Sequence, residues 1–387
     1  RRAELMRKRS DIRVGIPRAL NLYIYAPFFS GYLESLGVLA ENIVYSDYTN
    51  DKMYREGTSR GAIDPCFPSK VVIAHIHNLI YKHHKRKALD HIFLPMLDVL
   101  DSPLVNAKGT NACATVIATP QVAKAAFTKE NNVFADHGIE WVSPFIDFVD
   151  RKLLARQLHQ AWGEILGLSM EENERAIQAG FDALTRWRQD VQQKARDVID
   201  MLERENRLGI LALGRPYHHD PGLNQGIFEE FQKLGYPILS QSTLPFHEDL
   251  VDRLFGEEVA AGAMSHPLDI TDVWKSPNVA SSSHKVWAAK FAARHPNLIA
   301  VEVSNFKCGH DAPICRVIEQ IIERAGRPFF SFRDLDENKP TGSIRLRIET
   351  IHYFLKRHRE ELLRQEAVLE KVEEQLKEYR ASLHRGA

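Results

Sequence analysis

The sequence is poor in cysteine and has no long apolar run. Only four cysteines occur in 387 residues, and no Cys-x-x-Cys pair is among them. A disulfide framework and a paired-cysteine zinc motif are therefore not indicated. No apolar stretch approaches the roughly 18 residues that a membrane-spanning helix needs, so we expect no membrane association.

The sequence also lacks an excess of either charge. Lys and Arg total 51, as do Asp and Glu, which gives a formal net charge of zero. This balance argues against a nucleic-acid-binding protein that relies on a global basic field. Neither a Gly-x-x-x-x-Gly-Lys-Ser/Thr loop nor a Gly-x-Gly-x-x-Gly motif occurs. We therefore expect that this chain alone does not hydrolyse ATP.

The first residues lack the apolar core of a signal peptide. Residues 1–9 are rich in arginine, and the contents of 44% hydrophobic and 26% charged residues are ordinary for a soluble globular protein. We expect a cytoplasmic location, where cysteines are more often buried thiols or metal ligands than disulfides.

Short apolar runs alternate with helical patterns along most of the chain. Strands are expected at residues 12–16, 42–46, 91–95, 114–118, 208–213, 237–239, 298–303 and 328–332. Helices are expected at residues 23–36, 68–79, 120–127, 224–234 and 313–325. This alternation predicts an α/β protein with two Rossmann-like or flavodoxin-like domains, each on a parallel sheet. The similar element order of the two halves raises the hypothesis of an internal duplication.

The domain boundaries follow from two helical stretches. Residues 151–206 carry apolar positions at helical spacing on a charged background, so they are expected to form a helical connection between a first domain, 1–150, and a second, 207–342. Residues 343–387 are expected to form one long C-terminal helix.

The C-terminal helix carries a heptad pattern. Leu362, Leu369, Leu376 and Leu383 lie seven residues apart, which makes about three heptads. The favoured interpretation is a helix packed on its own domain. The alternative is a helix that pairs with another chain or module.

Three cysteines lie in loops suited to ligand binding. Cys66 precedes a helix expected to begin at Pro68, where the positive end of the helix dipole favours thiolate. Cys308 follows an expected strand, and ligands of parallel α/β proteins gather at that edge of the sheet. Cys113 stands at the start of the run at 114–118. Patterns alone still favour a buried thiol for each cysteine, and Cys315, inside an expected helix, fits that reading best.

Other candidates are polar residues in the same kinds of loop. Arg215, Tyr217 and His218 follow the strand expected at 208–213 and suit contact with an anion or an acyl ligand, although a solvated loop is an equal alternative. Lys307 and His310 flank Cys308 and are further candidates for substrate contact.

Several segments resemble motifs of a known family. They are residues 14–20, 64–70, 113–120, 214–218, 285–298, 306–313 and 334–343, of which the last two are the most specific. The chain resembles the 2-hydroxyacyl-CoA dehydratase and benzoyl-CoA reductase group. In particular, it is similar to the cluster-binding module of large CoA enzyme activase-type fusion proteins. The resemblance extends to about residue 358, and it is least close at Cys113, where the family's Asn-Cys-Pro is replaced by Ala-Cys-Ala.

The resemblance implies an iron–sulfur cluster between two α/β domains, held by Cys66, Cys113 and Cys308. Three thiolates leave one iron of a 4Fe-4S cluster without a protein ligand, and such an iron is sensitive to oxygen. A double-cubane cluster is the alternative, and its six ligand positions would require other ligands or a second chain in a homodimer. Electrons would come from an ATPase activator module, in cis or in trans. The substrate would be an acyl-CoA or a small molecule.

Two further hypotheses belong to other classes of function. The first is a non-catalytic binding or regulatory module with a structural zinc held by the three cysteines and His310. The second is an acyl-ligand-binding domain whose cysteines are all buried thiols.

Overall fold

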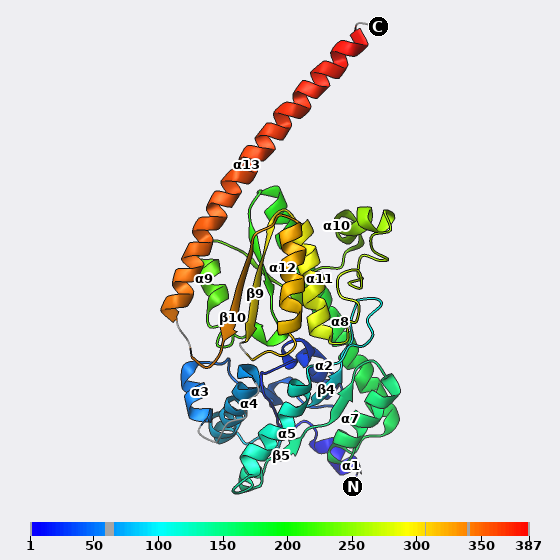
Figure 1. The fold of residues 1–387 in the computed structure, drawn as a ribbon. Helices are drawn as coiled ribbons and strands as arrows, with labels where there is room; N and C mark the ends of the chain where they lie inside the picture. The colour runs from blue at the N-terminus through cyan, green and yellow to red at the C-terminus, as the bar shows by residue number, and fades with distance from the viewer. Residues whose placement is uncertain (1, 59–65, 306, 339–340, 386–387) are drawn as a thin grey trace.

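The computed structural model describes residues 2–58, 66–305, 307–338 and 341–385. Two α/β domains are stacked on each other, and a long helix leaves the second domain (Figure 1). Five residues of the sequence motifs lie outside the described residues: Asp64, Pro65, Phe306, Lys339 and Pro340.

The first domain contains a parallel four-stranded sheet of order β2-β1-β3-β5. Its strands are β1 (Val14–Ile16), β2 (Ile43–Tyr45), β3 (His91–Phe93) and β5 (Glu140–Val142). A separate parallel pair, β4 (Met96–Val99) and β6 (Phe145–Asp147), continues the segments of β3 and β5. Pro95 and Pro144 stand at the two breaks, because proline has no N–H for a sheet ladder.

The second domain contains a parallel sheet of order β10-β9-β7-β8. Its strands are β7 (Gly209–Leu213), β8 (Ile238–Ser240), β9 (Leu298–Asn305) and β10 (Phe329–Leu335). Leaving the β4–β6 pair aside, both sheets have the order 2-1-3-4 within their domain, which is the flavodoxin-like arrangement. The predicted α/β fold with parallel sheets is confirmed, and the shared strand order is consistent with the hypothesis of duplication.

Helices surround both sheets. The first domain has α1 (Arg2–Lys8), α2 (Leu22–Ser35), η1 (Ala40–Asn42), α3 (Asp51–Gly57), α4 (Phe67–Asn78), η3 (Leu79–His84), α5 (Ala114–Thr128), α6 (Val133–Asp136) and α7 (Arg151–Leu166). The second has η4 (Pro216–His219), α9 (Ile227–Lys233), η5 (Gln241–Thr243), α10 (Glu248–Ala260), α11 (Ala280–Arg294) and α12 (Ala312–Arg324). No helix in the described part of the chain is both long and apolar enough to span a membrane.

The strand expected at residues 114–118 is wrong, because these residues form the first turns of α5. Thr115, Val116 and Ile117 suggested a strand because β-branched residues are enriched there. In the structure, Val116 and Ala123 are buried on one side of α5, in the core of the first domain. Burial of one helix face therefore outweighs the local preference. The strands β4, β5 and β6 and the helices α10 and α11 were not predicted.

Helix α8 (Met170–Arg204) connects the domains. Its N-terminal half packs closely on α2: a Cβ added at Gly180 would lie 2.8 Å from the Phe28 carbonyl oxygen. Its C-terminal half contributes Ile199 and Leu202 to the core of the second domain. The predicted helical connection thus consists of α7 and α8, separated at Gly167, whose φ of 62° is in the left-handed region.

Helix α13 (Thr341–Arg385) has two different halves. Ile344, Ile348, Ile351 and Leu355 are buried against the second sheet. Beyond them, Leu369, Val372 and Leu376 are exposed, and the helix extends away from the domain (Figure 1). Packing on its own domain is therefore confirmed for the first half, while pairing of the second half with a partner stays a prediction.

Candidate functional site

The loops at the carboxyl ends of the two sheets face each other. Tyr23, after β1, donates a hydrogen bond to Asp220, which follows β7. The backbone N–H of Thr49, after β2, donates to the same carboxylate over 3.0 Å. A ligand held at this seam would lie at the edge where parallel α/β proteins bind their ligands.

Cys66 lies at this seam, as the N-cap residue of α4. Its half-buried sulfur is 3.4 Å from the Ser69 hydroxyl oxygen. Ser69 in turn accepts a hydrogen bond from Thr119 of α5 over 3.0 Å. This chain of contacts ties the start of α4 to α5, the helix that follows Cys113.

Cys113 is the N-cap residue of α5 and is also half-buried. Its carbonyl oxygen accepts the backbone N–H of Ile117 over 2.9 Å, the first hydrogen bond of the helix. Residues 114–118 form the start of α5 and not the predicted strand. Cys113 therefore has the same position as Cys66, at the start of a helix.

Cys308 lies in the turn between β9 and α12. Its carbonyl oxygen accepts the backbone N–H groups of Asp311 and Ala312, at the start of α12. Burial raises the pKa of the Cys308 thiol, and the Asp311 carboxylate raises it further, while Arg215 acts in the opposite direction. All three predicted thiols therefore stand at or just before helix N-termini.

Two of these thiols affect the pKa of Tyr217. Its side chain is 4% exposed. Burial raises the pKa of Tyr217 well above its ordinary value; Arg215 opposes this, and charges on Cys308 and Cys66 add to it. Cys66 of the first domain and Cys308 of the second thus both contribute to the electrostatic environment of Tyr217.

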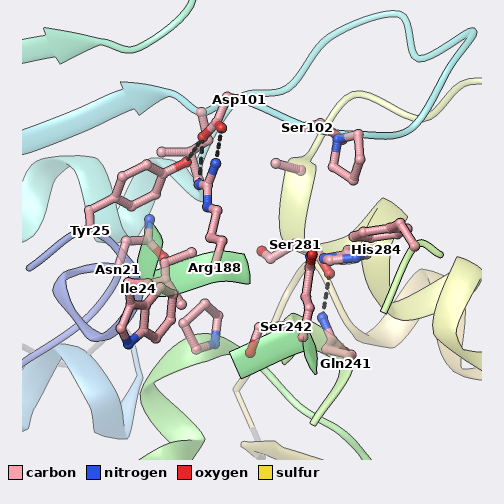
Figure 2. A pocket seen from close by; sticks show the side chains of 17 residues that line it. Asn21, Ile24, Tyr25, Asp101, Ser102, Arg188, Gln241, Ser242, Ser281 and His284 are labelled. Atoms are coloured by element: carbon pink, nitrogen blue, oxygen red, sulfur yellow. Dashed lines mark hydrogen bonds and ion pairs between the residues drawn. The ribbon is translucent and has the colours of Figure 1, made fainter. Parts of the chain in front are cut away.

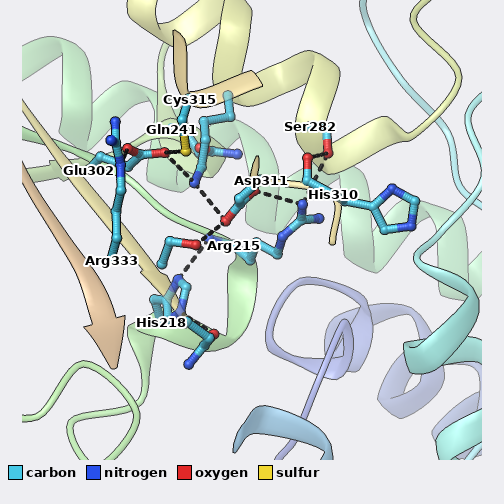
Figure 3. A network of polar contacts seen from close by, with 12 residues as sticks. Arg215, His218, Gln241, Ser282, Glu302, His310, Asp311, Cys315 and Arg333 are labelled. Atoms are coloured by element: carbon cyan, nitrogen blue, oxygen red, sulfur yellow. Dashed lines mark hydrogen bonds and ion pairs between the residues drawn. The ribbon is translucent and has the colours of Figure 1, made fainter. Parts of the chain in front are cut away.

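Arg215 belongs to a buried polar network that also contains Asp311 and Glu302 (Figure 3). Its guanidinium donates to the hydroxyls of Ser281 and Ser282 and to the Asp311 carboxylate over 2.8 Å. Lys285, 0% exposed, also donates to Asp311, over 3.0 Å. Although burial alone would raise the pKa of Asp311, the charges of Lys285 and Arg215 hold it far below its ordinary value.

One observation makes this network suitable for an anion. The network is balanced in charge, because Arg215, Lys285 and Arg333 face the carboxylates of Asp311, Glu302 and Glu319. The Arg215 Nε, however, is buried and has no hydrogen-bond partner in the described structure. Buried donors are normally satisfied, so this unused N–H is available to an acceptor.

The remaining predicted residues differ in their placement. His218 is 1% exposed; its Nδ1 accepts the Arg215 backbone N–H over 2.9 Å, and its Nε2 lies 3.2 Å from the Asn305 side-chain oxygen. Both nitrogens are engaged, so His218 positions the Arg215 loop. Lys307 is exposed and His310 is half-buried beside Arg215. The alternative of a solvated loop at Arg215, Tyr217 and His218 is wrong.

No three His, Cys, Asp or Glu side chains among the described residues lie close enough together to hold a metal ion. Cys315 lies within α12, where its thiol donates to Glu302 over 3.7 Å; burial followed by that carboxylate raises its pKa to about 11. Sequence reasoning missed Lys285 and Asp311. The available signal for Lys285 was its position directly before the apolar run Val286-Trp287-Ala288-Ala289.

Comparison with known proteins gives one family. The family described as CoA enzyme activase uncharacterised domain (DUF2229) matches residues 13–244, which is more than half of the chain. The matched range includes Cys66, Cys113 and Arg215 but ends before Cys308. A search of curated proteins finds no match. The chain belongs to the CoA enzyme activase uncharacterised domain family.

Proposed function

We propose that this chain is the electron-accepting component of an ATP-coupled reductase or dehydratase, with an iron–sulfur cluster held by Cys66, Cys113 and Cys308. The observation that carries the proposal is the placement of the three thiols. Cys66 and Cys113 are the N-cap residues of α4 and α5, and Cys308 lies in the turn that leads into α12.

The surrounding residues suit an anionic group. A cluster bound by three thiolates would supply one-electron transfer, with one iron open to another ligand. Arg215 would donate its unused Nε–H, while Asp311, Ser281 and Ser282 hold the guanidinium in place. The buried Tyr217 ring would help to exclude water.

Loading would require the three thiols to approach one another. Among the described residues no three metal-ligating side chains form such a group. Cys66 and Cys308 belong to opposite domains, so closure of the seam would bring their sulfurs together. We therefore expect the loaded protein to be more compact at the domain seam than the metal-free protein.

The description of the family supports the proposed partner and substrate. Its description as a CoA enzyme activase domain supports an ATPase activator, in cis or in trans, as the electron donor, and an acyl-CoA or a small molecule as the acceptor. Because the sequence has no P-loop motif, the pure chain should not hydrolyse ATP. Appreciable turnover by the pure chain would contradict the need for a partner.

The test is metal analysis of anaerobically purified protein. We expect iron and acid-labile sulfide in equal amounts, together with an electron paramagnetic resonance signal after reduction. Cys66→Ala, Cys113→Ala and Cys308→Ala should each lose most of the iron. Cys315→Ala is the matched control and should retain it, because that thiol is engaged with Glu302.

Two outcomes would contradict the proposal. Zinc without sulfide would favour the structural metal site of a regulatory module. The second outcome is that neither the wild type nor any of the four variants binds metal after reconstitution with iron and sulfide. This result would favour an acyl-ligand-binding domain with ordinary thiols.

A further inference from the structure

A pocket of about 300 Å³ opens between the two domains, apart from the thiols. Its walls come from α2, the loop after β4, α8, η5 and the start of α11. Figure 2 shows Asn21 and Tyr25 on one side and Gln241, Ser242, Ser281 and His284 on the other. Ser281 also accepts a hydrogen bond from Arg215, so this pocket adjoins the polar network near Cys308.

The pocket holds polar groups that no described residue satisfies. Asn21 is 6% exposed, and its side-chain amide neither caps α2 nor bonds another described residue. On the opposite wall, Gln241 Oε1 and His284 Nε2 are also without a partner in the described structure. The Asn21 amide is open to the pocket, so it can pair with a ligand that has both a donor and an acceptor.

The pocket carries no net charge. Arg188 is paired with Asp101, with 3.0 Å between Nη2 and Oδ1, and Tyr25 donates to the same carboxylate. Burial, followed by the charge of Arg188, lowers the pKa of His284 to about 4, so this histidine is neutral near pH 7. A charged ligand would find no free counter-charge here, which favours a neutral one.

The remaining walls are apolar and aromatic. Ile24, Trp187 and Phe246 line the pocket, and the Phe246 ring stacks on His284 at 5.8 Å between centroids. Planar aromatic rings prefer such surroundings. The pocket therefore suits a neutral, flat ring that carries an N–H donor next to a ring-nitrogen acceptor. Adenine has this pair of groups, and an amide side chain can form hydrogen bonds with both.

We propose that this pocket binds the purine ring of an adenine-containing ligand, paired with the side-chain amide of Asn21 and flanked by Trp187 and Phe246. The proposal does not rest on the iron–sulfur cluster, because none of the three thiols lines this pocket. A free nucleoside, ATP and coenzyme A all carry this ring.

Titration calorimetry on the full metal-free chain provides the test. Adenosine is compared with purine riboside, which lacks the exocyclic amino group. We expect adenosine to bind about tenfold more tightly, as one lost hydrogen bond to a buried group predicts. Asn21→Leu should remove most of this preference. The variant should fold, because the Asn21 side chain makes no capping hydrogen bond.

Two further variants make the result specific. Asn278→Leu, the same change at an exposed position near the seam, should leave both affinities unchanged. Trp187→Leu should weaken both ligands by a similar factor and leave their ratio intact, because it removes ring contact and not the hydrogen bonds.

Titrations with ATP and coenzyme A identify which adenine-containing molecule is the ligand. Whichever of the two binds more tightly than adenosine is the better ligand. Weaker binding of both than of adenosine indicates a free nucleoside. The proposal is overturned if adenosine does not bind at millimolar concentration. It is equally overturned if adenosine and purine riboside bind alike, or if Asn21→Leu preserves the preference.

Discussion

At the scale of single residues, burial distinguishes charged and polar side chains that look alike in the sequence. Arg215 stands in a polar loop, yet it is 3% exposed because Asp311, Ser281 and Ser282 meet it from other elements. A buried charge is tolerated only with such partners, and these lie 66 to 96 positions away in sequence. Sequence reasoning identified Arg215 as a candidate but had no way to find its partners.

His75 illustrates the same point and leads to a pH-dependent prediction. The ring is 0% exposed and bonds the hydroxyls of Ser46 and Thr49 over 2.8 and 3.1 Å. Burial lowers the pKa of His75 from 6.5 to about 4. The unfolded chain therefore takes up the proton first, and the stability that His75 contributes is complete above pH 6.5 and is lost as the pH falls toward 4.

We expect His75 to account for a loss of about 3 kcal/mol in the free energy of unfolding between pH 6.5 and 4. His75→Gln should show a shallower pH dependence in urea unfolding, since glutamine does not titrate. His266→Gln, at an exposed position, is the control. Equal slopes for wild type and His75→Gln would contradict the prediction.

At the scale of secondary-structure elements, contacts between helices decide what local preference leaves open. α5 forms where a strand was expected, because Val116, Ala123 and Phe127 are buried in the core of the first domain. The close contact of α8 with α2 similarly depends on small residues. Gly31 lies opposite Ala183, and Gly180 lies opposite Phe28.

Gly180→Ala should destabilise the protein. The added Cβ would lie 2.8 Å from the Phe28 carbonyl and 2.9 Å from its ring, so the helices would have to separate. We expect a loss of about 1–3 kcal/mol in the free energy of unfolding by chemical denaturation.

Gly256→Ala in α10 is the matched control, because its added Cβ meets nothing within 4 Å. It should stabilise the protein by about 0.5–1 kcal/mol through helix propensity. A neutral result for Gly180→Ala would show that α2 and α8 are not tightly packed.

At the scale of the whole molecule, three long-range features hold the parts together: α8, the seam of facing loops, and the first half of α13. The seam joins loops of the two domains through the hydrogen bonds that Tyr23 and Thr49 donate to Asp220. The exposed half of α13 extends away from both domains (Figure 1). Its exposed apolar residues are a surface without a partner in the described structure.

Two truncations separate the roles of α13. Removal of residues 359–387 should leave the melting temperature nearly unchanged, because the buried positions end at Leu355. Removal of residues 341–387 should lower it strongly, since four buried aliphatic side chains contribute about 1.5–3 kcal/mol each.

Thermal unfolding and size-exclusion chromatography check both truncations. If the exposed half pairs with another chain, the shorter truncation should also reduce the apparent mass by more than the lost residues. Strong destabilisation by the shorter truncation would contradict the division of α13 into two halves.

The sequence by itself determined the α/β class, the positions of most strands, the long helices and the thiols worth considering, because apolar periodicity and turn residues act locally. The tertiary structure decided that residues 114–118 are helical, that Arg215 and Lys285 are buried, and that a neutral pocket lies between the domains. These features depend on contacts between residues far apart in the chain. Their energies outweigh local preferences, and no single segment contains them.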